Sequence, residues 1–402
     1  MLLLSCLFGS LAWATTTIAA QDCVGIKAVS PQCKTNESSY TRDVFFVGGG
    51  YAPSGIDNQS IYSDQMYVEK LTPAKGSSKP HPLIFISAGI PSGTAWLNTP
   101  DNRKGWASYF LDKGYQVYTV DIIANGRSGQ NDVVKYPIRF ASTDVIHENG
   151  FTAPENLDPY PQSQGHTQWP GSGVRGDPIF DAFFAQTVPV TSNTTAVELS
   201  MRAAGCKLLS LIGPSYLIAH SNGATYTSLM SDECPSSIKA TINLEPGNIP
   251  FQSLFGNDTV PAVGRLPSRP YGLTNTPITY DPPVSNATTD LNPVEVGIDT
   301  LALRSCFLQS NESAVHTLTE IAKVPYIMFT AANSPHITYD HCFVSFLQQA
   351  GVQDVTWIKF GDLGIQGNGH FFFIELNNLE LARVVDKEIA RRDKGKSVRP
   401  GR

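Results

Sequence analysis

The chain has 402 residues, of which 41% are hydrophobic and 16% are charged, a balance typical of a globular protein of one domain or two. Its formal net charge of −6 lacks the excess of Lys and Arg that nucleic-acid binding needs. The basic run at residues 391–402 is typical of a solvated tail, so we expect no nucleic-acid partner.

Residues 1–20 predict a signal peptide for secretion. The stretch MLLLSCLFGSLAWATTTIAA has an apolar core and ends in the small residues Ala19 and Ala20, before the polar Gln21 and Asp22. Ser, Gly and Thr interrupt the apolar segment, which is shorter than the roughly 20 residues that a membrane span needs. We therefore expect a secreted, extracellular protein with no stable membrane anchor.

Two further features agree with a secretory route. Sequons for N-linked glycans occur at Asn36, Asn58, Asn193, Asn257, Asn286 and Asn311. Removal of the signal peptide leaves an even number of cysteines, which predicts a disulfide framework. Pairing of sequence neighbours is favoured, and would join Cys23 to Cys33, Cys206 to Cys234, and Cys306 to Cys342. No Cys or His spacing resembles a zinc site, so no metal is expected.

Along the chain, short apolar runs alternate with segments of helical spacing, which predicts a mostly parallel sheet covered by helices. An antiparallel hairpin is expected first, from residues 43–49 and 65–71. Six later runs predict strands at 82–89, 115–121, 215–221, 240–246, 324–331 and 355–360. Helical spacing occurs at 105–114, after Asn222, at 340–351 and at 373–392. A hairpin followed by βα units is the order of an α/β hydrolase, so we expect that fold with an eight-stranded sheet.

Two segments, at about 130–205 and about 250–300, break this alternation. Both are rich in Pro, Gly, Asn and Thr, and segments of this length usually carry function or form a small cap. We expect residues 21–402 to form a single domain, with both segments inserted over the C-terminal edge of the sheet, where α/β proteins place their sites.

The sequence around Ser221 predicts a nucleophile. Ser221 lies between a predicted strand and a predicted helix, in the pentapeptide Ala219-His220-Ser221-Asn222-Gly223. Strand, serine and helix crowd together in such a turn, so it needs small residues two positions before and after the serine. The helix that follows directs free backbone N–H groups at the site, and the amide of Asn222 can therefore help to stabilise an oxyanion.

A serine hydroxyl needs a base to remove its proton, and in this fold the base is a histidine late in the chain. His370 lies after the last predicted strand and before the last helix, in a Gly-rich loop, and is the leading candidate. We expect His336 and His341 to be surface or supporting residues, and His220 to be a turn residue beside the nucleophile.

The carboxylate that would orient His370 has two candidates. The usual position after the seventh strand offers Asn333 instead of an acid, and Asp340 follows several residues later. Glu245 lies directly after the sixth strand, whose C-terminal end neighbours that of the seventh. On this geometry we favour Glu245 and keep Asp340 as the alternative.

Several motifs, taken together, resemble the esterase 713-like group of α/β hydrolases. They are Gly93-Thr94-Ala95-Trp96, Thr99-Pro100-Asp101, Gly105-Trp106 and FLDKGYQVYTVDIIANGRS, followed in order by LIAHSNG, NLEPG and GNGHFFFIELNN. The resemblance spans residues 40 to 390 approximately. It implies a Ser-His-Glu triad, which carries onto Ser221, His370 and Glu245. It also implies that Gly89 and Asn222 supply the oxyanion amides.

These residues predict a serine esterase that cleaves small-molecule carboxylic esters through an acyl-enzyme intermediate, with no organic cofactor. Two alternatives stay open. One is an enzyme of the same fold that catalyses a condensation, cyclisation or lactonisation in secondary metabolism, and the other is a non-catalytic secreted binding protein. An interfacial lipase ranks lower, because it would need an apolar lid and the expected caps are polar and Pro-rich. A homodimer is neither predicted nor excluded.

Overall fold

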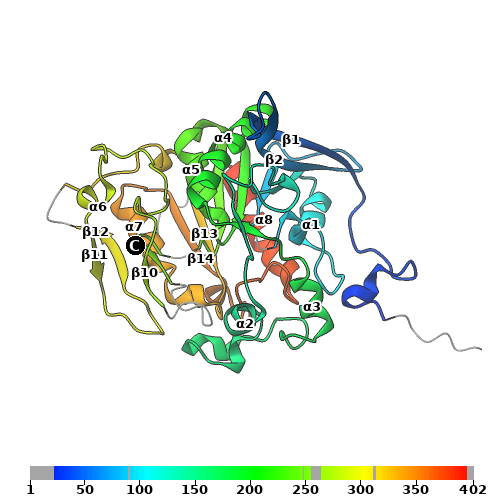
Figure 1. Ribbon diagram of the computed structural model, residues 1–402. Coiled ribbons are helices and arrows are strands. Elements are labelled where there is room, and N and C mark those ends of the chain that lie inside the picture. Colours follow the sequence, from blue (N-terminus) through cyan, green and yellow to red (C-terminus); the bar gives the residue numbers. More distant parts are fainter. Residues whose placement is uncertain (1–21, 89–90, 248, 255–263, 311–313, 396–402) are drawn as a thin grey trace, which may run out of the picture.

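We describe the protein from a computed structural model, in which residues 22–88, 91–247, 249–254, 264–310 and 314–395 are described (Figure 1). The predicted signal peptide, Gly89 and the sequons at Asn257 and Asn311 lie outside these residues. An eight-stranded sheet crosses the centre of the molecule, with helices on both of its faces.

The central sheet contains the eight strands that the sequence predicts, in the order β1-β2-β4-β3-β7-β8-β13-β14. β2 pairs antiparallel with β1 and with β4, whereas the five remaining pairs are parallel. The strands are β1 (Tyr40–Pro53), β2 (Ser60–Pro73), β3 (Leu83–Ile86), β4 (Val117–Asp121), β7 (Ser215–His220), β8 (Ile238–Leu244), β13 (Tyr326–Thr330) and β14 (Val355–Lys359). The expected α/β-hydrolase arrangement is therefore confirmed.

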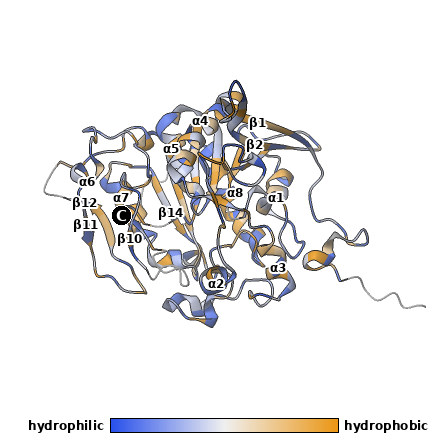
Figure 2. Ribbon diagram, viewed as in Figure 1, coloured by the Kyte–Doolittle hydropathy of each residue, from blue (hydrophilic) through white to orange (hydrophobic). Residues whose placement is uncertain are grey.

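Helices cover both faces of this sheet. They are α1 (Trp106–Asp112), α4 (Thr194–Ile212), α5 (Gly223–Glu233), α7 (His341–Gln349) and α8 (Asn378–Asp393), with the shorter α2 (Asp144–His147), α3 (Pro178–Phe184) and α6 (Ala287–Asp290). Because side chains alternate along a strand, Phe85 of β3 packs with α1 and α8, whereas Ile84 and Ile86 pack with α4 on the other face. Hydrophobic residues gather in these central strands (Figure 2).

Helix α4 corrects one boundary expected from the sequence. It begins at Thr194, inside the segment assigned to an insertion at about 130–205, and packs its buried side chains against the central sheet. The side-chain oxygen of Asn193 accepts a hydrogen bond from the amide of Ala196 at 3.1 Å and so caps the helix. The helical pattern was hidden because its first turn begins with two β-branched threonines and follows a Pro- and Thr-rich stretch.

Small sheets and disulfides hold the segments outside the central sheet. Among the described residues these sheets pair β5 (Ile138–Arg139) with β6 (Val190–Thr191), β9 (Gln252–Ser253) with β10 (Leu266–Pro267), and β11 (Pro293–Val296) with β12 (Cys306–Gln309). Disulfides join Cys23 to Cys33, Cys206 to Cys234, and Cys306 to Cys342, the same neighbouring pairs that the sequence favours. The second ties α4 to the residue after α5, and the third ties β12 to α7.

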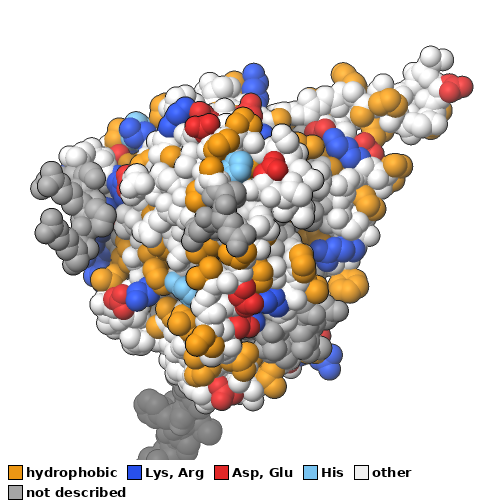
Figure 3. Space-filling view, turned by 90° about the vertical axis from the view of Figure 1, so that its left-hand side faces the viewer, with side chains coloured by type: hydrophobic (Ala, Val, Ile, Leu, Met, Phe, Trp, Pro, Cys, Tyr) orange, Lys and Arg blue, Asp and Glu red, His pale blue; other side chains and the backbone are white. Residues whose placement is uncertain are grey.

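The outer surface on the β11–β12 side mixes hydrophobic side chains with acidic and basic ones (Figure 3). In the part of the chain that the structure describes, no helix combines the length and the apolar character needed to cross a membrane.

Candidate active site

Ser221 occupies a strained turn between β7 and α5. Its φ angle is +53°, in the left-handed region that non-glycine residues rarely adopt, and its amide donates to the carbonyl oxygen of Leu244 at 3.0 Å. Gly223 is needed here, because a Cβ atom at that position would lie 2.9 Å from the carbonyl oxygen of Ile86. The turn thus has the tight strand-serine-helix geometry expected of a nucleophile elbow.

Glu245 lies at the end of the neighbouring strand, directly after β8. It is fully buried and has a φ angle of +51°. Its carboxylate accepts the Nδ1–H of His370 at 2.6 Å, the hydroxyl of Ser334 at 2.6 Å and the amide of Ala331 at 2.8 Å. These bonds fix the carboxylate and leave it turned toward the imidazole.

His370 is held at this edge by contacts with its main chain and with its ring. The Nε2–H of His220 donates to the carbonyl oxygen of His370 at 3.0 Å, and the ring of Phe151 lies 4.8 Å from the imidazole. His220 is therefore a buried support for the loop, not only a turn residue beside Ser221. Among the described residues, Ser221 and His370 do not hydrogen-bond to each other, but His220, which precedes Ser221, contacts His370 directly.

A second carboxylate fixes the loop before His370. Glu375 accepts hydrogen bonds from the amide of Gly369 and from the side chain of Asn368. It also accepts from Nε2 of His166 at 2.9 Å, while Nδ1 of the same imidazole lies 2.8 Å from Glu155. Burial opposes protonation of His166, but the two carboxylates outweigh it and raise its pKa to about 9. A buried imidazolium thus ties the loop to residue 155.

The electrostatic setting keeps His370 neutral. Burial, reinforced by the nearby His220, His336 and His147, lowers the pKa of His370 well below its ordinary value. A neutral imidazole that donates Nδ1–H to Glu245 has Nε2 available as a base. Burial also raises the pKa of Glu245, although the bonds from Ser334 and Ala331 act in the opposite direction.

Asp340, the alternative acid, contacts a different histidine. Its carboxylate accepts from Nδ1 of His336 at 2.8 Å and from the hydroxyl of Thr330 at 2.5 Å. The ring of His336 lies parallel to that of His370, with centroids 4.7 Å apart and 2° between the planes. His336 is buried, so a surface position for it is wrong, and it belongs to the support of the site.

Asn222 follows Ser221 and is the N-cap residue of helix α5. A Cβ atom at Gly247 would lie 3.0 Å from the amide nitrogen of Asn222, so only glycine at 247 leaves that amide uncrowded. The other amide expected at an oxyanion site, that of Gly89, lies outside the described residues.

Two groups of described side chains have a composition that could bind a metal. In one, Cys306 and Cys342 are joined by their disulfide beside His341, which uses both thiols. In the other, atoms of Glu245, His336 and His370 lie within 4.8 Å of one another. In this group, Nδ1 of His370 and the carboxylate of Glu245 are already used in their mutual hydrogen bond.

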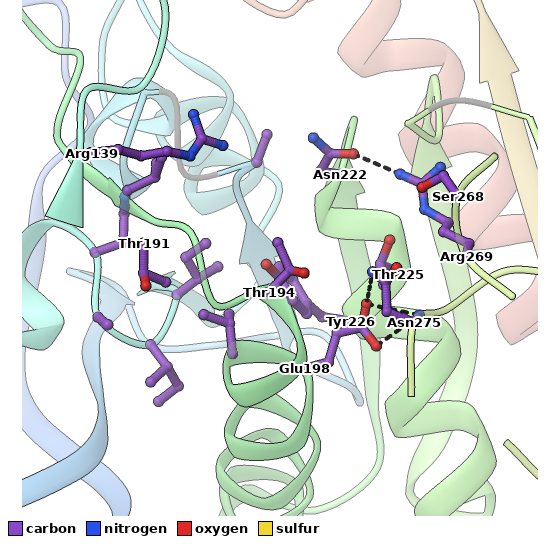
Figure 4. A pocket seen from close by; sticks show the side chains of 17 residues that line it. Arg139, Thr191, Thr194, Glu198, Asn222, Thr225, Tyr226, Ser268, Arg269 and Asn275 are labelled. Carbon is purple, nitrogen blue, oxygen red and sulfur yellow. Dashed lines mark hydrogen bonds between the residues drawn. The ribbon is translucent and has the colours of Figure 1, made fainter. Parts of the chain in front are cut away.

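A pocket lies beside Asn222 (Figure 4). It is lined by the ends of β3 and β4, the first turns of α4 and α5, and residues 268–275. Its buried Arg269 donates through Nη2 to the side-chain oxygen of Asn222 at 3.0 Å. No sequence motif marked Arg269, because it lies in an irregular segment and reaches the site only through tertiary folding.

The strand order and the position of this site define the class of the protein: it is an α/β hydrolase. No protein-family model matches the chain. The solved structure of a novel bacterial esterase superposes with a TM-score of 0.57 at 20% identity, covering 89% of this chain and 99% of that one, a likeness of fold alone.

A relative identified by sequence shows which α/β hydrolases this chain is related to. Over 353 residues the chain is 37% identical to "Probable secreted lipase phiG" of a fungal species (strain ATCC 74256), covering 88% of this chain and 90% of that protein. The chain belongs to the α/β-hydrolase family that includes this lipase.

Proposed function

We propose that the protein is a secreted serine hydrolase of the esterase 713-like group that cleaves small-molecule carboxylic esters. Ser221 is the nucleophile, His370 the base and Glu245 the acid of the triad. The observation that carries the proposal is the buried 2.6 Å hydrogen bond between His370 Nδ1 and Glu245, at the strand end next to the strained Ser221 turn.

In this mechanism, Nε2 of His370 removes the proton of Ser221 as the serine oxygen attacks the ester carbonyl carbon. Glu245 keeps Nδ1 protonated and stabilises the imidazolium that forms. The amides of Asn222 and Gly89 stabilise the negative charge on the former carbonyl oxygen. His370 then protonates the departing alcohol. In the second half of the reaction, His370 takes a proton from water as the water attacks the acyl carbon, and it returns a proton to Ser221 as the acid is released. Contacts between nucleophile and base are commonly long in substrate-free enzymes and tighten on binding.

Secretion is part of the proposal. It is supported by the segment at residues 1–20, by the sequons and disulfides, and by the name of the fungal relative as a secreted lipase. We further propose that residues 21–402 act as one domain, with the segments at about 130–193 and 250–300 forming the walls of the site.

The test is labelling of the secreted, deglycosylated protein with a fluorophosphonate probe, followed by turnover of p-nitrophenyl esters. Intact-mass analysis should show one added probe in the wild type and none in Ser221→Ala. Ser210→Ala is the matched control, because its hydroxyl bonds only within α4 and should leave labelling unchanged.

The outcomes separate the candidate functions. Labelling at Ser221 with ester turnover supports the esterase. Labelling without turnover of any ester would favour a non-hydrolytic condensation, cyclisation or lactonisation, and a folded protein that takes up no probe would favour a binding role.

A further inference from the structure

The pocket beside Asn222 has a volume of about 280 Å³ and starts at the two segments assigned to the oxyanion. Asn222 follows the nucleophile, and Ala88 precedes the loop that contains Gly89. A group attached to an ester at Ser221 would have this pocket beside it, because Asn222 directly follows Ser221. The volume suits an arm of a few heavy atoms.

One side of the pocket is lined by Arg269, a buried cationic side chain. The residue is only 7% exposed, yet among the described residues its Nη1 has no hydrogen-bond partner and the guanidinium faces no carboxylate in an ion pair. Its φ angle of +47° is strained for a residue with a side chain. Glu198 attracts the guanidinium electrostatically without forming an ion pair with it. A buried cation that lacks a direct anionic partner is costly, so the arrangement indicates a partner that arrives with the ligand.

The carboxylate that lines the same pocket, that of Glu198, already accepts hydrogen bonds from other residues. Glu198 is 3% exposed, and its carboxylate accepts hydrogen bonds from the amides and side chains of Asn275 and Thr276. Those bonds hold the carboxylate at the 274–276 turn, so Glu198 attracts Arg269 electrostatically but forms no ion pair with it.

Arg139 faces the pocket from the opposite side (Figure 4). The β5–β6 pairing brings it beside Val190 and Thr191, which also line the pocket. Its Nη1 donates to the carbonyl oxygen of Phe140, and in the described part of the chain no carboxylate forms an ion pair with it. Two guanidinium groups and one carboxylate thus leave a single net positive charge around the pocket.

We propose that this pocket binds a carboxylate carried by the ester substrate, with Arg269 as the buried contact and Arg139 as the contact at the mouth. A guanidinium matches the planar geometry of a carboxylate through paired N–H donors, and one net positive charge suits a monoanion better than a phosphate dianion. The inference rests on the proposed function, and it names the substrate class: half-esters of dicarboxylic acids, or esters of carboxylate-bearing alcohols.

The experiment compares two substrates that differ only in charge: the p-nitrophenyl monoester of adipic acid and the p-nitrophenyl ester of adipamic acid. The readout is the ratio of kcat/KM for the acid to kcat/KM for the amide. We expect the wild type to favour the acid, and Arg269→Gln to lower the ratio about tenfold or more. Arg139→Gln should lower it less, and Arg383→Gln, on the exposed face of α8, should not change it.

Competition distinguishes the source of the anion. Adipate should inhibit hydrolysis of the adipamate ester more strongly than inorganic phosphate does, and the reverse order would contradict the carboxylate assignment. If Arg269→Gln does not fold, Arg139→Gln decides: a lowered ratio supports the proposal and an unchanged ratio overturns it.

Failure of this inference is separable from failure of the esterase proposal. Fluorophosphonate labelling of Ser221 with a preference for the neutral ester would overturn the anion pocket alone. Absence of labelling would overturn the esterase itself.

Discussion

Two buried imidazole–carboxylate pairs lie side by side at the C-terminal edge of the sheet, and only one of them includes a residue of the strand end beside Ser221, the proposed nucleophile. His336 and Asp340 are four residues apart and pair within one turn, whereas His370 and Glu245 are 125 residues apart and meet only because the sheet brings them together. Glu245 follows Leu244, whose carbonyl oxygen accepts from the amide of Ser221. The strand that neighbours the Ser221 turn, more than the kind of residue, therefore decides which pair lies beside that serine.

The largest effect should come from Glu245→Gln. A neutral amide cannot stabilise the imidazolium of His370 and can hold the ring in the wrong tautomer, so kcat should fall about 10³–10⁴-fold. Ester turnover measures this, and thermal unfolding monitors the fold. A folded Glu245→Gln variant with nearly full activity would mean that another group orients His370.

A third buried imidazole, that of His166, should make the stability of the fold depend on pH. His166 has a raised pKa of about 9, so its contribution to folding is complete below the unfolded pKa near 6.5 and is lost as pH rises through 9. Between these values the free energy of unfolding should decrease by on the order of 3 kcal/mol. Urea unfolding at several pH values without reductant measures it.

The matched variant is His166→Gln, which should remove most of this slope. An equal slope in the variant and the wild type would show that other groups cause the pH dependence.

A smaller effect is expected from Asp340→Asn, the counterpart of Glu245→Gln. The substitution disturbs His336 and Thr330 but leaves the His370–Glu245 bond in place, so kcat should fall by no more than about tenfold. The unfolding temperature should fall, because buried hydrogen bonds are lost. If Asp340→Asn lowers kcat as much as Glu245→Gln, the assignment of the acid is wrong.

The fold was predictable because its elements have local signals. The eight strands of the central sheet are short apolar runs, and four major helices show a clear period. Helix α4 was missed because its threonine-led first turn follows a Pro-rich stretch, and local propensity there points away from a helix.

The site was only partly predictable for a different reason. Ser221, Glu245 and His370 follow strands or stand in a marked turn, so topology alone places them at one edge. The parallel stacking of His336 on His370 and the approach of Arg269 to Asn222 are tertiary contacts between distant segments. Nothing in the residues around Arg269 announces such a contact, since the same pattern would suit an exposed loop arginine.

The smallest expected effect is that of His336→Gln, which tests whether the His336–Asp340 pair influences the pKa of His370. Burial is the main reason that the pKa of His370 is lowered, and the neighbouring His220 and His336 lower it further. The acidic limb of the kcat/KM profile reports this pKa, because only neutral His370 can take the serine proton. We expect the wild type to stay active below pH 6.5, and the limb of His336→Gln to move toward neutral pH. His316→Gln, whose ring bonds the carbonyl oxygen of Pro282, is the control and should leave the limb in place. A loss of packing alone would lower the rate at every pH without moving the limb, so a fixed limb in His336→Gln would restrict the second pair to a structural role.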